Sequence, residues 1–424
     1  MANVEIKSAE MLDVDKMSAP LGNSPVSRHY ASWIRKAGSF TSGGAGSAGY
    51  DLNCGRYLKL ALQSEIDKAT AQASLEQNTT YWDACVELPA RIAEKMWVEN
   101  HIKIDPAKEL TLTCGITPAI DTILSVFVDD GDEVVSMDPD FVTSYGQILA
   151  RNAELVTAPA FHEEKGNLGE TRWKFDPNVL EDAITPKAKM ILYTNPINPI
   201  GYVYTKEDLT AIADIARRHN LIVVENECYE RLVHSESFYR TLKFTSLAAV
   251  APDWRDRIIT VQGVSKGYHL SGYRIGWIAA SSEITSMLKF SQIWSTFSVA
   301  PTVTQFGAFA ALAMPLRESY VRSALDVYRQ NIDITCNTLQ NICGIECPRP
   351  MAGPFCFMDV TNTGYTDWEF SKLLYERGVN TVAGSPWGKK NGKNHLRLAL
   401  SNPPAYQQEC VKALASAIHD ILSH

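Results

Sequence analysis

Short apolar runs that alternate with amphipathic segments constrain this chain more than any other feature. From about residue 109, six runs of strand length are rich in Val, Ile and Leu: Leu110–Cys114, Glu133–Met137, Met190–Thr194, Leu221–Glu225, Ile258–Gln262 and Ile275–Ala280. Between them, Pro118–Val128 and Lys206–His219 carry apolar residues at helical spacing. This alternation predicts an α/β fold with a mostly parallel sheet that is covered by helices on both faces.

The pattern changes after about residue 315. A long helical stretch runs from Pro315 to about Ile342, short strands follow near Phe355–Val360 and His395–Leu400, and Ala405–Leu422 forms a terminal helix. We predict three parts: an N-terminal arm and loop (1–50), a large domain (51–314) whose first part can pack with the small domain, and a smaller α+β domain (315–424).

Composition and charge exclude several classes of protein. Forty Lys and Arg oppose 48 Asp and Glu, giving a net charge of −8, and without a basic run we expect no nucleic-acid partner. The acidic start of the chain has no apolar core of a signal peptide, and no stretch is long enough to span a bilayer, so we expect a cytoplasmic protein without membrane contact. The nine cysteines include no CxxC pair, which favours reduced thiols and predicts no metal site.

One glycine-rich stretch, Gly44–Gly49, satisfies the GxGxxG dinucleotide pattern literally. No apolar strand precedes it, and the residues that follow do not open a helix. We therefore interpret it as a loop.

Two motifs indicate ligand contacts at strand ends. Thr113–Thr117 runs from a strand through a glycine into a helix, where the free N–H groups of Ile116 and Thr117 suit a phosphate. A plain packing turn is the alternative. Asn195–Gly201 (NPINPIG) forms a rigid turn after another strand, from which Asn198 can reach a ligand. Turn formation alone would also explain this motif.

Two further motifs follow in the chain. Val224–Tyr229 ends a strand with polar groups at the same edge of the predicted sheet. Ser265–Trp277 places Lys266 among glycines and hydroxyls, with Arg274 further along. Such a lysine can form a Schiff base and such an arginine can bind an anion, although a single lysine is usually only a surface residue.

The four motifs, in this order, resemble the fold-type I, pyridoxal-phosphate-dependent aminotransferases of class I/II, the aspartate aminotransferase-like family. The resemblance extends from Asp51–Gly55 to the region of Arg397. Its most specific parts are the NPINPIG turn and the segment that contains Lys266 and Arg274.

The resemblance implies how pyridoxal 5'-phosphate would be held. Lys266 matches the lysine that forms the Schiff base and later moves the Cα proton, and Phe141 matches the ring that stacks on the pyridine. Asn198 and Tyr229 match the pair that hydrogen-bonds the phenolic oxygen. Five residues match the phosphate ligands: Ser265, Arg274, Ile116, Thr117 and Tyr81, the last reaching across from the partner subunit.

The resemblance also implies the substrate contacts and the assembly. Arg397 matches the arginine that grips the substrate α-carboxylate, and Asn198 and Gly55 match neighbouring substrate contacts. Because the family builds its sites between two subunits, a homodimer is implied.

Asn226 departs from the family pattern, which has an aspartate beside the pyridine nitrogen. The aspartate's charge keeps the ring protonated, and the protonated ring accepts electrons from Cα. A neutral amide removes this stabilisation. Either the substitution only slows an aminotransferase, or it belongs to a different reaction.

We expect transamination of an L-amino acid. A rival hypothesis keeps the cofactor but assigns a lyase, a γ-replacement enzyme or an oxygen-dependent amino-acid oxidase, because this fold hosts many reactions. A third hypothesis is a cofactor-binding protein without turnover. Lys266, Tyr229 and Arg397 argue against the third, because binding alone needs no proton carrier.

Overall fold

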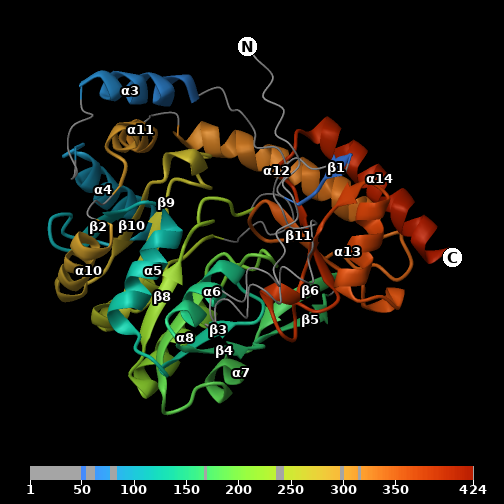
Figure 1. Ribbon diagram of the computed structural model, residues 1–424, viewed down its shortest axis with the longest axis horizontal. Helices are drawn as coiled ribbons and strands as arrows, with labels where there is room; N and C mark the ends of the chain where they lie inside the picture. The colour runs from blue at the N-terminus through green and yellow to red at the C-terminus, as the bar shows by residue number, and fades with distance from the viewer. Residues whose placement is uncertain are drawn as a thin grey trace, which may run out of the picture.

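A seven-stranded sheet organises most of the chain in the computed structural model, which describes residues 49–53, 63–76, 84–166, 170–234, 243–296, 300–313 and 317–423 (Figure 1). The strands follow the order β2 (Leu110–Thr113), β10 (Gly276–Ala279), β9 (Ile258–Gly263), β8 (Ile222–Asn226), β7 (Ala188–Thr194), β3 (Glu133–Met137) and β4 (Glu154–Ala158). Strands β9, β8, β7, β3 and β4 run parallel to one another, whereas β10 runs antiparallel to both of its neighbours, β2 and β9. The predicted α/β class with a mostly parallel sheet is confirmed.

Helices cover both faces of this sheet. One face packs against α4 (Leu88–Asn100), α7 (Pro177–Asp182), α8 (Lys206–His219), α9 (Leu247–Val250) and α11 (Thr302–Ala313), and the other against α5 (Ile116–Phe127), α6 (Val142–Ala150) and α10 (Ser282–Ser295). Strand β7 illustrates why the strands are apolar throughout: Ile191 and Tyr193 belong to the first core, whereas Met190 and Leu192 belong to the second. Helix α3 (Gln63–Glu76) lies outside, against α11.

Helix α8 shows how local sequence sets an element's bounds. The Thr205 hydroxyl accepts a hydrogen bond from the Asp208 backbone N–H, and the Asp208 carboxylate accepts one from the Thr205 N–H. Asn220 ends the helix in the left-handed conformation, at φ 53°. The helix therefore begins and ends where its sequence predicts.

The C-terminal residues build a core of their own, separate from the two cores that flank the large sheet. It contains α12 (Arg317–Leu339), α13 (Asp367–Glu376), α14 (Pro404–Leu422) and the antiparallel sheet β11 (Phe355–Asp359), β14 (His395–Ala399) and β13 (Val382–Ala383). Strand β1 (Tyr50–Asp51) pairs with β12 (Val379–Asn380), and Leu52 is buried in this core. Early residues thus pack against late ones, while the boundary at residue 314 stays a prediction.

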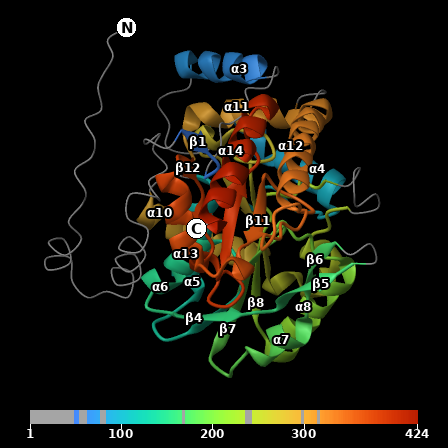
Figure 2. The same cartoon turned by 90° about the vertical axis from the view of Figure 1, so that its right-hand side faces the viewer.

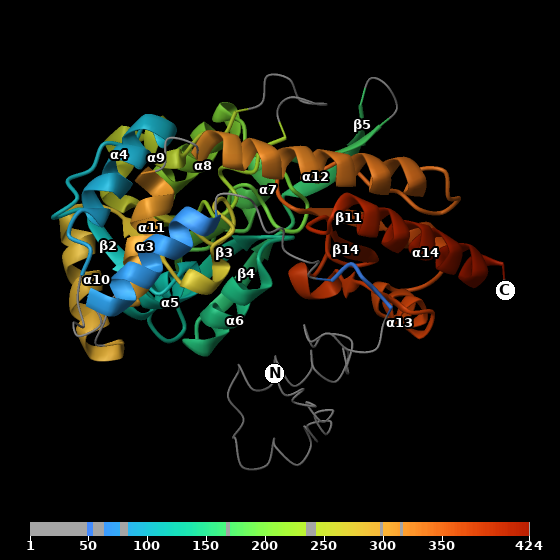
Figure 3. The same ribbon diagram turned by 90° about the horizontal axis from the view of Figure 1, so that it is seen from above.

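The large sheet with its covering helices and the C-terminal core lie toward opposite ends of the molecule. Helices α4 and α10 are at one end and α13 and α14 at the other, and α12 extends between them (Figures 1 and 3). Figure 2 shows α14 and β11 in front of the large sheet when the C-terminal end faces the viewer. The hairpin β5 (Phe161–Lys165) and β6 (Thr171–Phe175) projects beside them. Within the described ranges, no helix is long and apolar enough to cross a membrane.

Candidate active site

Several strand ends meet at one cavity. Strands β2, β3, β7, β8 and β9 end at the same edge of the sheet, which is where open α/β sheets bind ligands. A cavity of about 310 Å³ lies there, between this edge and residues of β11 and β14. Ten residues singled out from the sequence line it: Ile116, Thr117, Phe141, Asn198, Asn226, Tyr229, Ser265, Lys266, Arg274 and Arg397. Tyr81, Gly55 and most of the Gly44–Gly49 stretch lie outside the described residues.

One end of the cavity is built for an anion. Helix α5 begins at Ile116 without a side-chain cap, and its first residues, Ile116 and Thr117, line the cavity. Gly115, at φ 92°, precedes the helix, and a Cβ atom there would lie 2.4 Å from Nη2 of Arg274. The glycine therefore lets the guanidinium approach the helix start. The backbone of Arg274 adopts the left-handed conformation, at φ 56°. Its Nη1 donates to the Ser271 carbonyl oxygen at 2.7 Å.

Three polar side chains form a chain across the cavity. Asn198 Nδ2 donates to the Tyr229 hydroxyl at 3.2 Å, and Nη1 of Arg397 donates to Asn198 Oδ1 at 3.4 Å. The second terminal nitrogen of Arg397, Nη2, donates to the Asn53 carbonyl oxygen at 3.2 Å. The amide of Asn198 thus links the tyrosine of the β8 end to the arginine of β14.

Aromatic rings hold Arg397 in place. Its guanidinium carbon lies 4.6 Å from the Trp387 ring centre and 5.9 Å from that of Phe355. Phe355 in turn meets Tyr229 edge to face at 5.2 Å. Sequence reasoning missed both Trp387 and Phe355, because neither lies in a motif.

Phe141 is held by the acid before it. Asp140 is buried, and its carboxylate accepts hydrogen bonds from the N–H groups of Phe141 at 2.6 Å and Thr194 at 3.0 Å. Burial raises the pKa of Asp140 to about 7. This acid connects the end of β3 to the end of β7.

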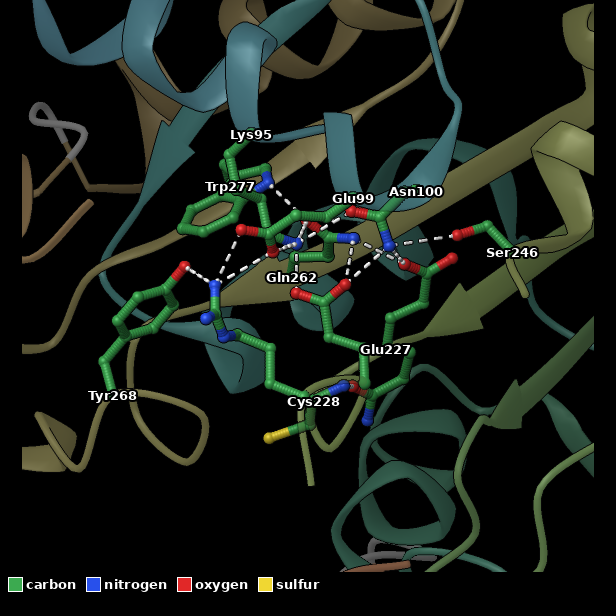
Figure 4. Close-up of polar contacts among 12 residues, drawn as sticks. Lys95, Glu99, Asn100, Glu227, Cys228, Ser246, Gln262, Tyr268 and Trp277 are labelled. Atoms are coloured by element: carbon green, nitrogen blue, oxygen red, sulfur yellow. Dashed lines mark hydrogen bonds and ion pairs between the residues drawn. The ribbon is translucent and has the colours of Figure 1, made fainter. Parts of the chain in front are cut away.

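A buried polar network joins residues of α4 and β9 to Glu227 and Glu230, which follow β8 (Figure 4). Lys95 Nζ contacts Glu230, Asn100 Oδ1 at 2.8 Å and Gln262 Oε1 at 3.1 Å. Glu227 accepts a hydrogen bond from Gln262 Nε2 at 2.5 Å, and burial raises its pKa well above the usual range. The raised pKa favours the uncharged form of Glu227, and an uncharged carboxyl group there would lessen the negative charge around Lys95.

Lys266 lines the same cavity. The neighbouring His269 is largely buried, with Nε2 at 2.6 Å from the Tyr328 hydroxyl. Burial, and then the charge of Lys266, lower the pKa of His269 to about 4. The histidine is therefore neutral at pH 7 and adds no second charge beside the lysine amine.

The donor set fits pyridoxal 5'-phosphate. The helix start with Arg274 and Ser265 suits a phosphate, Phe141 offers a ring face, and Asn198 with Tyr229 suits a phenolic oxygen. Lys266 supplies an amine in the same cavity. Neither an anion clamp alone nor an amine alone would select this cofactor, but their combination in one cavity does.

Comparisons with known proteins agree with this geometry. Residues 49–417 match the family described as aminotransferase class I and II. The chain is 30% identical to the aspartate aminotransferase of Pyrococcus abyssi, over 83% of this chain and 88% of that protein. It is 28% identical to aromatic-amino-acid aminotransferase 2 of Thermococcus litoralis, over 80% and 84%.

A solved structure shows the same architecture. The aromatic aminotransferase from Pyrococcus horikoshii superposes with a TM-score of 0.78 at 28% identity, covering 88% of this chain and 97% of that one. Fold, cavity and sequence therefore point the same way, and the chain belongs to the aminotransferase class I and II family, as an enzyme that uses pyridoxal 5'-phosphate.

Proposed function

We propose that this cavity transfers the α-amino group of an L-amino acid to a 2-oxo acid, with Lys266 as the proton carrier and Arg397 as the carboxylate ligand. The observation that carries the proposal is that Lys266, Arg397 and the Asn198–Tyr229 pair line one cavity. Arg397 offers two parallel N–H donors, which suit a carboxylate better than a point charge does.

The protein's residues divide the work. When bound, the cofactor supplies an aldehyde for the amino group and a ring that withdraws electrons from Cα. Arg274 and the α5 amides bind its phosphate, and Phe141 packs on its ring. Lys266 would take the proton from Cα of the substrate and return it to the carbon that came from the cofactor's aldehyde, on the other side of the transferred nitrogen. Addition of water would then release the 2-oxo acid, and the same steps in reverse would pass the amino group to the acceptor 2-oxo acid.

The walls favour an apolar or aromatic substrate side chain. Pro354, Phe355 and Ala399 line the cavity next to Arg397, and Trp387 stacks on the guanidinium. Among the described lining residues, Arg274 and Arg397 are the only arginines, and we assign one to the phosphate and the other to the α-carboxylate. A substrate with a second carboxylate would lack a cationic partner in that part of the wall.

We also propose a homodimer. Large apolar side chains are exposed on α4 and α10, including Trp97, Phe290 and Trp294, which is 76% exposed. A groove of about 430 Å³ lies between these helices, lined by Pro89, Ala90 and Ile293 among others. Exposed patches of this kind mark interfaces, and the predicted role of Tyr81 in a partner's site requires one. Sedimentation of wild type and Trp294→Glu tests this, since a monomeric wild type would contradict it.

Asn226 favours a second candidate reaction. Its neutral amide lines the cavity where the resemblance places a ring nitrogen, and a less protonated ring would stabilise the Cα carbanion less. Elimination, γ-replacement or oxidation by oxygen are the reactions that the same residues would then serve.

One experiment tests all of these reactions. Each of the twenty amino acids is incubated with the enzyme, cofactor and a set of 2-oxo acids, and the 2-oxo acid, ammonia and peroxide products are measured. We expect amino-group transfer without stoichiometric ammonia, fastest for aromatic or large apolar amino acids. Ammonia or peroxide in stoichiometric amounts would support the second candidate, and no product from any amino acid would overturn both.

The cytoplasmic location of the protein stays a prediction.

A further inference from the structure

Three cysteines meet in the C-terminal core. Cys336 lies in α12, Cys347 in the loop after it and Cys356 in β11. The Sγ atom of Cys336 is 3.7 Å from that of Cys356 and 4.0 Å from that of Cys347, and the three sulfur atoms all lie within 4.8 Å of one another. These cysteines are free.

The sulfur spacing matches the edges of a metal–thiolate site. Two thiolates bound to one zinc ion at about 2.3 Å and tetrahedral angles lie about 3.8 Å apart, close to both measured distances. A disulfide would instead need about 2.0 Å between two sulfurs and would leave the third sulfur unused.

The surroundings suit a thiophilic cation whose complex with the three thiolates carries only a small net charge. Cys336 and Cys356 are buried, and Ile332 and Leu400 pack around them, which keeps water from competing for the ion. Cys347 is only half-buried and leaves a side from which an ion can enter. The guanidinium of Arg349 lies close enough to interact with the charges of Cys336 and Cys356. It is held by Asp333 at 2.6 Å and by Asn337.

We propose that Cys336, Cys347 and Cys356 form a zinc site with three thiolate ligands and a water molecule in the fourth position. Binding of Zn²⁺ to three thiols forms three Zn–S bonds and releases three protons, so no oxidant or reductant is needed. The complex carries one negative charge, which the nearby Arg349 guanidinium, itself paired with Asp333, offsets in part. Zinc is favoured over copper(I), because Cu⁺ with three thiolates would leave a second negative charge in an apolar core.

The site would brace the wall of the cavity. Cys356 follows Phe355, which touches Tyr229 and Arg397. The ion would tie this part of β11 to α12, which extends from the large sheet toward the C-terminal core (Figure 3). Binding to the folded state alone would stabilise the fold by mass action.

Zinc content tests the proposal directly. The holoenzyme is expressed with added zinc, purified under reducing conditions without chelator, and analysed by inductively coupled plasma mass spectrometry. We expect about one zinc ion per chain. Cys356→Ala and Cys336→Ala should lose it, whereas Cys343→Ser, which changes the exposed cysteine outside the trio, should keep it. Visible absorbance of the bound cofactor and the melting temperature verify that each variant is folded.

A second measurement needs no variant. Cobalt(II) added to the metal-free wild type should give the near-ultraviolet thiolate-to-metal bands, and a mercurial, which binds thiolates more tightly than zinc does, should release the zinc. The proposal is overturned by reduced wild type that binds no zinc, by zinc retained equally in both alanine variants, or by copper(I) bound in preference to zinc. A disulfide among the three cysteines in fresh protein, found by peptide mass mapping, would also overturn it.

Discussion

The backbone N–H of Cys228 donates a hydrogen bond to Oδ1 of Asn226 at 3.2 Å. The amide oxygen at the end of β8 is therefore occupied by the chain itself, and the amide NH₂ remains to face the cavity that Asn226 lines. An NH₂ group donates to a neutral ring nitrogen, whereas a carboxylate there would stabilise a protonated one. In this orientation Asn226 would act as a hydrogen-bond donor toward the cofactor ring, and not as an acceptor.

Asn226→Asp tests what that polarity does. The carboxylate keeps the acceptor for the Cys228 N–H and adds a negative charge toward the ring, so we expect faster amino-group transfer with the same products. Stopped-flow absorbance and product analysis measure both. A changed product ratio would instead support a specialised reaction. If the aspartate variant matches wild type in rate, products and spectrum, residue 226 is not the partner of the ring nitrogen.

Lys266→Ala should abolish turnover, because the variant has no amine in the cavity to carry the Cα proton. The expected loss in kcat is at least about 100-fold. The proposed phosphate ligands, Arg274 and the α5 amides, are unchanged, so we expect cofactor still to bind, with the visible spectrum of the free aldehyde. Lys206→Ala, at the exposed start of α8, is the matched control and should keep wild-type rates. Equal activity in both variants would refute the assignment of Lys266.

Arg397→Lys should lower kcat/KM by about 10- to 100-fold, because a point charge replaces a fork that makes two parallel hydrogen bonds. The loss should include a higher KM, and a lower kcat where the carboxylate is misaligned. Steady-state kinetics with the best amino acid measure both. The corresponding amine without a carboxylate serves as control substrate, and its rate should change little. An unchanged KM for the amino acid would rule out this role.

The sequence alone predicted the large sheet and most of the described cavity lining, and physical reasons explain its limits. Strands buried on both faces, such as β7, appear as continuous apolar runs, and residues just after strand ends meet at one edge. The hairpin β5–β6 was missed because much of β5 is exposed and charged, so no apolar run marks it.

Contacts between distant segments were also missed. Trp387 lies in a short 3₁₀ turn (Ser385–Trp387) and reaches Arg397 only through the fold. Cys336, Cys347 and Cys356 have none of the short spacings that indicate a metal site. Glu227 becomes part of a polar network only when Lys95 and Gln262 pack beside it.

Asp140 should make stability fall as pH rises from about 4 to about 7. Its pKa is raised to about 7 by burial in the folded state, against an ordinary value of 3.8. In this window the folded state holds a proton that the unfolded state has lost, so the free energy of unfolding decreases with pH, by up to about 1.4 kcal/mol per pH unit. Urea unfolding of wild type and Asp140→Asn measures this, and the difference between them should shrink or reverse across the window. Asp130→Asn, at an exposed position, should not change the pH dependence.

Lys95→Met should destabilise the protein by about 3 to 5 kcal/mol, because it leaves Glu230 buried without its cationic partner. Lys95 is fully buried, and its amine contacts Glu230, Asn100 and Gln262 together (Figure 4). Lys68→Met is the matched control: Lys68 pairs with Glu65 on α3 but is 73% exposed, so its loss should change stability by less than about 1 kcal/mol. Adding Glu230→Gln to Lys95→Met should recover part of the lost stability, since the unpaired charge is then gone. Denaturant melts of the four proteins measure this, and equal destabilisation by the two lysine variants would contradict a buried ion pair.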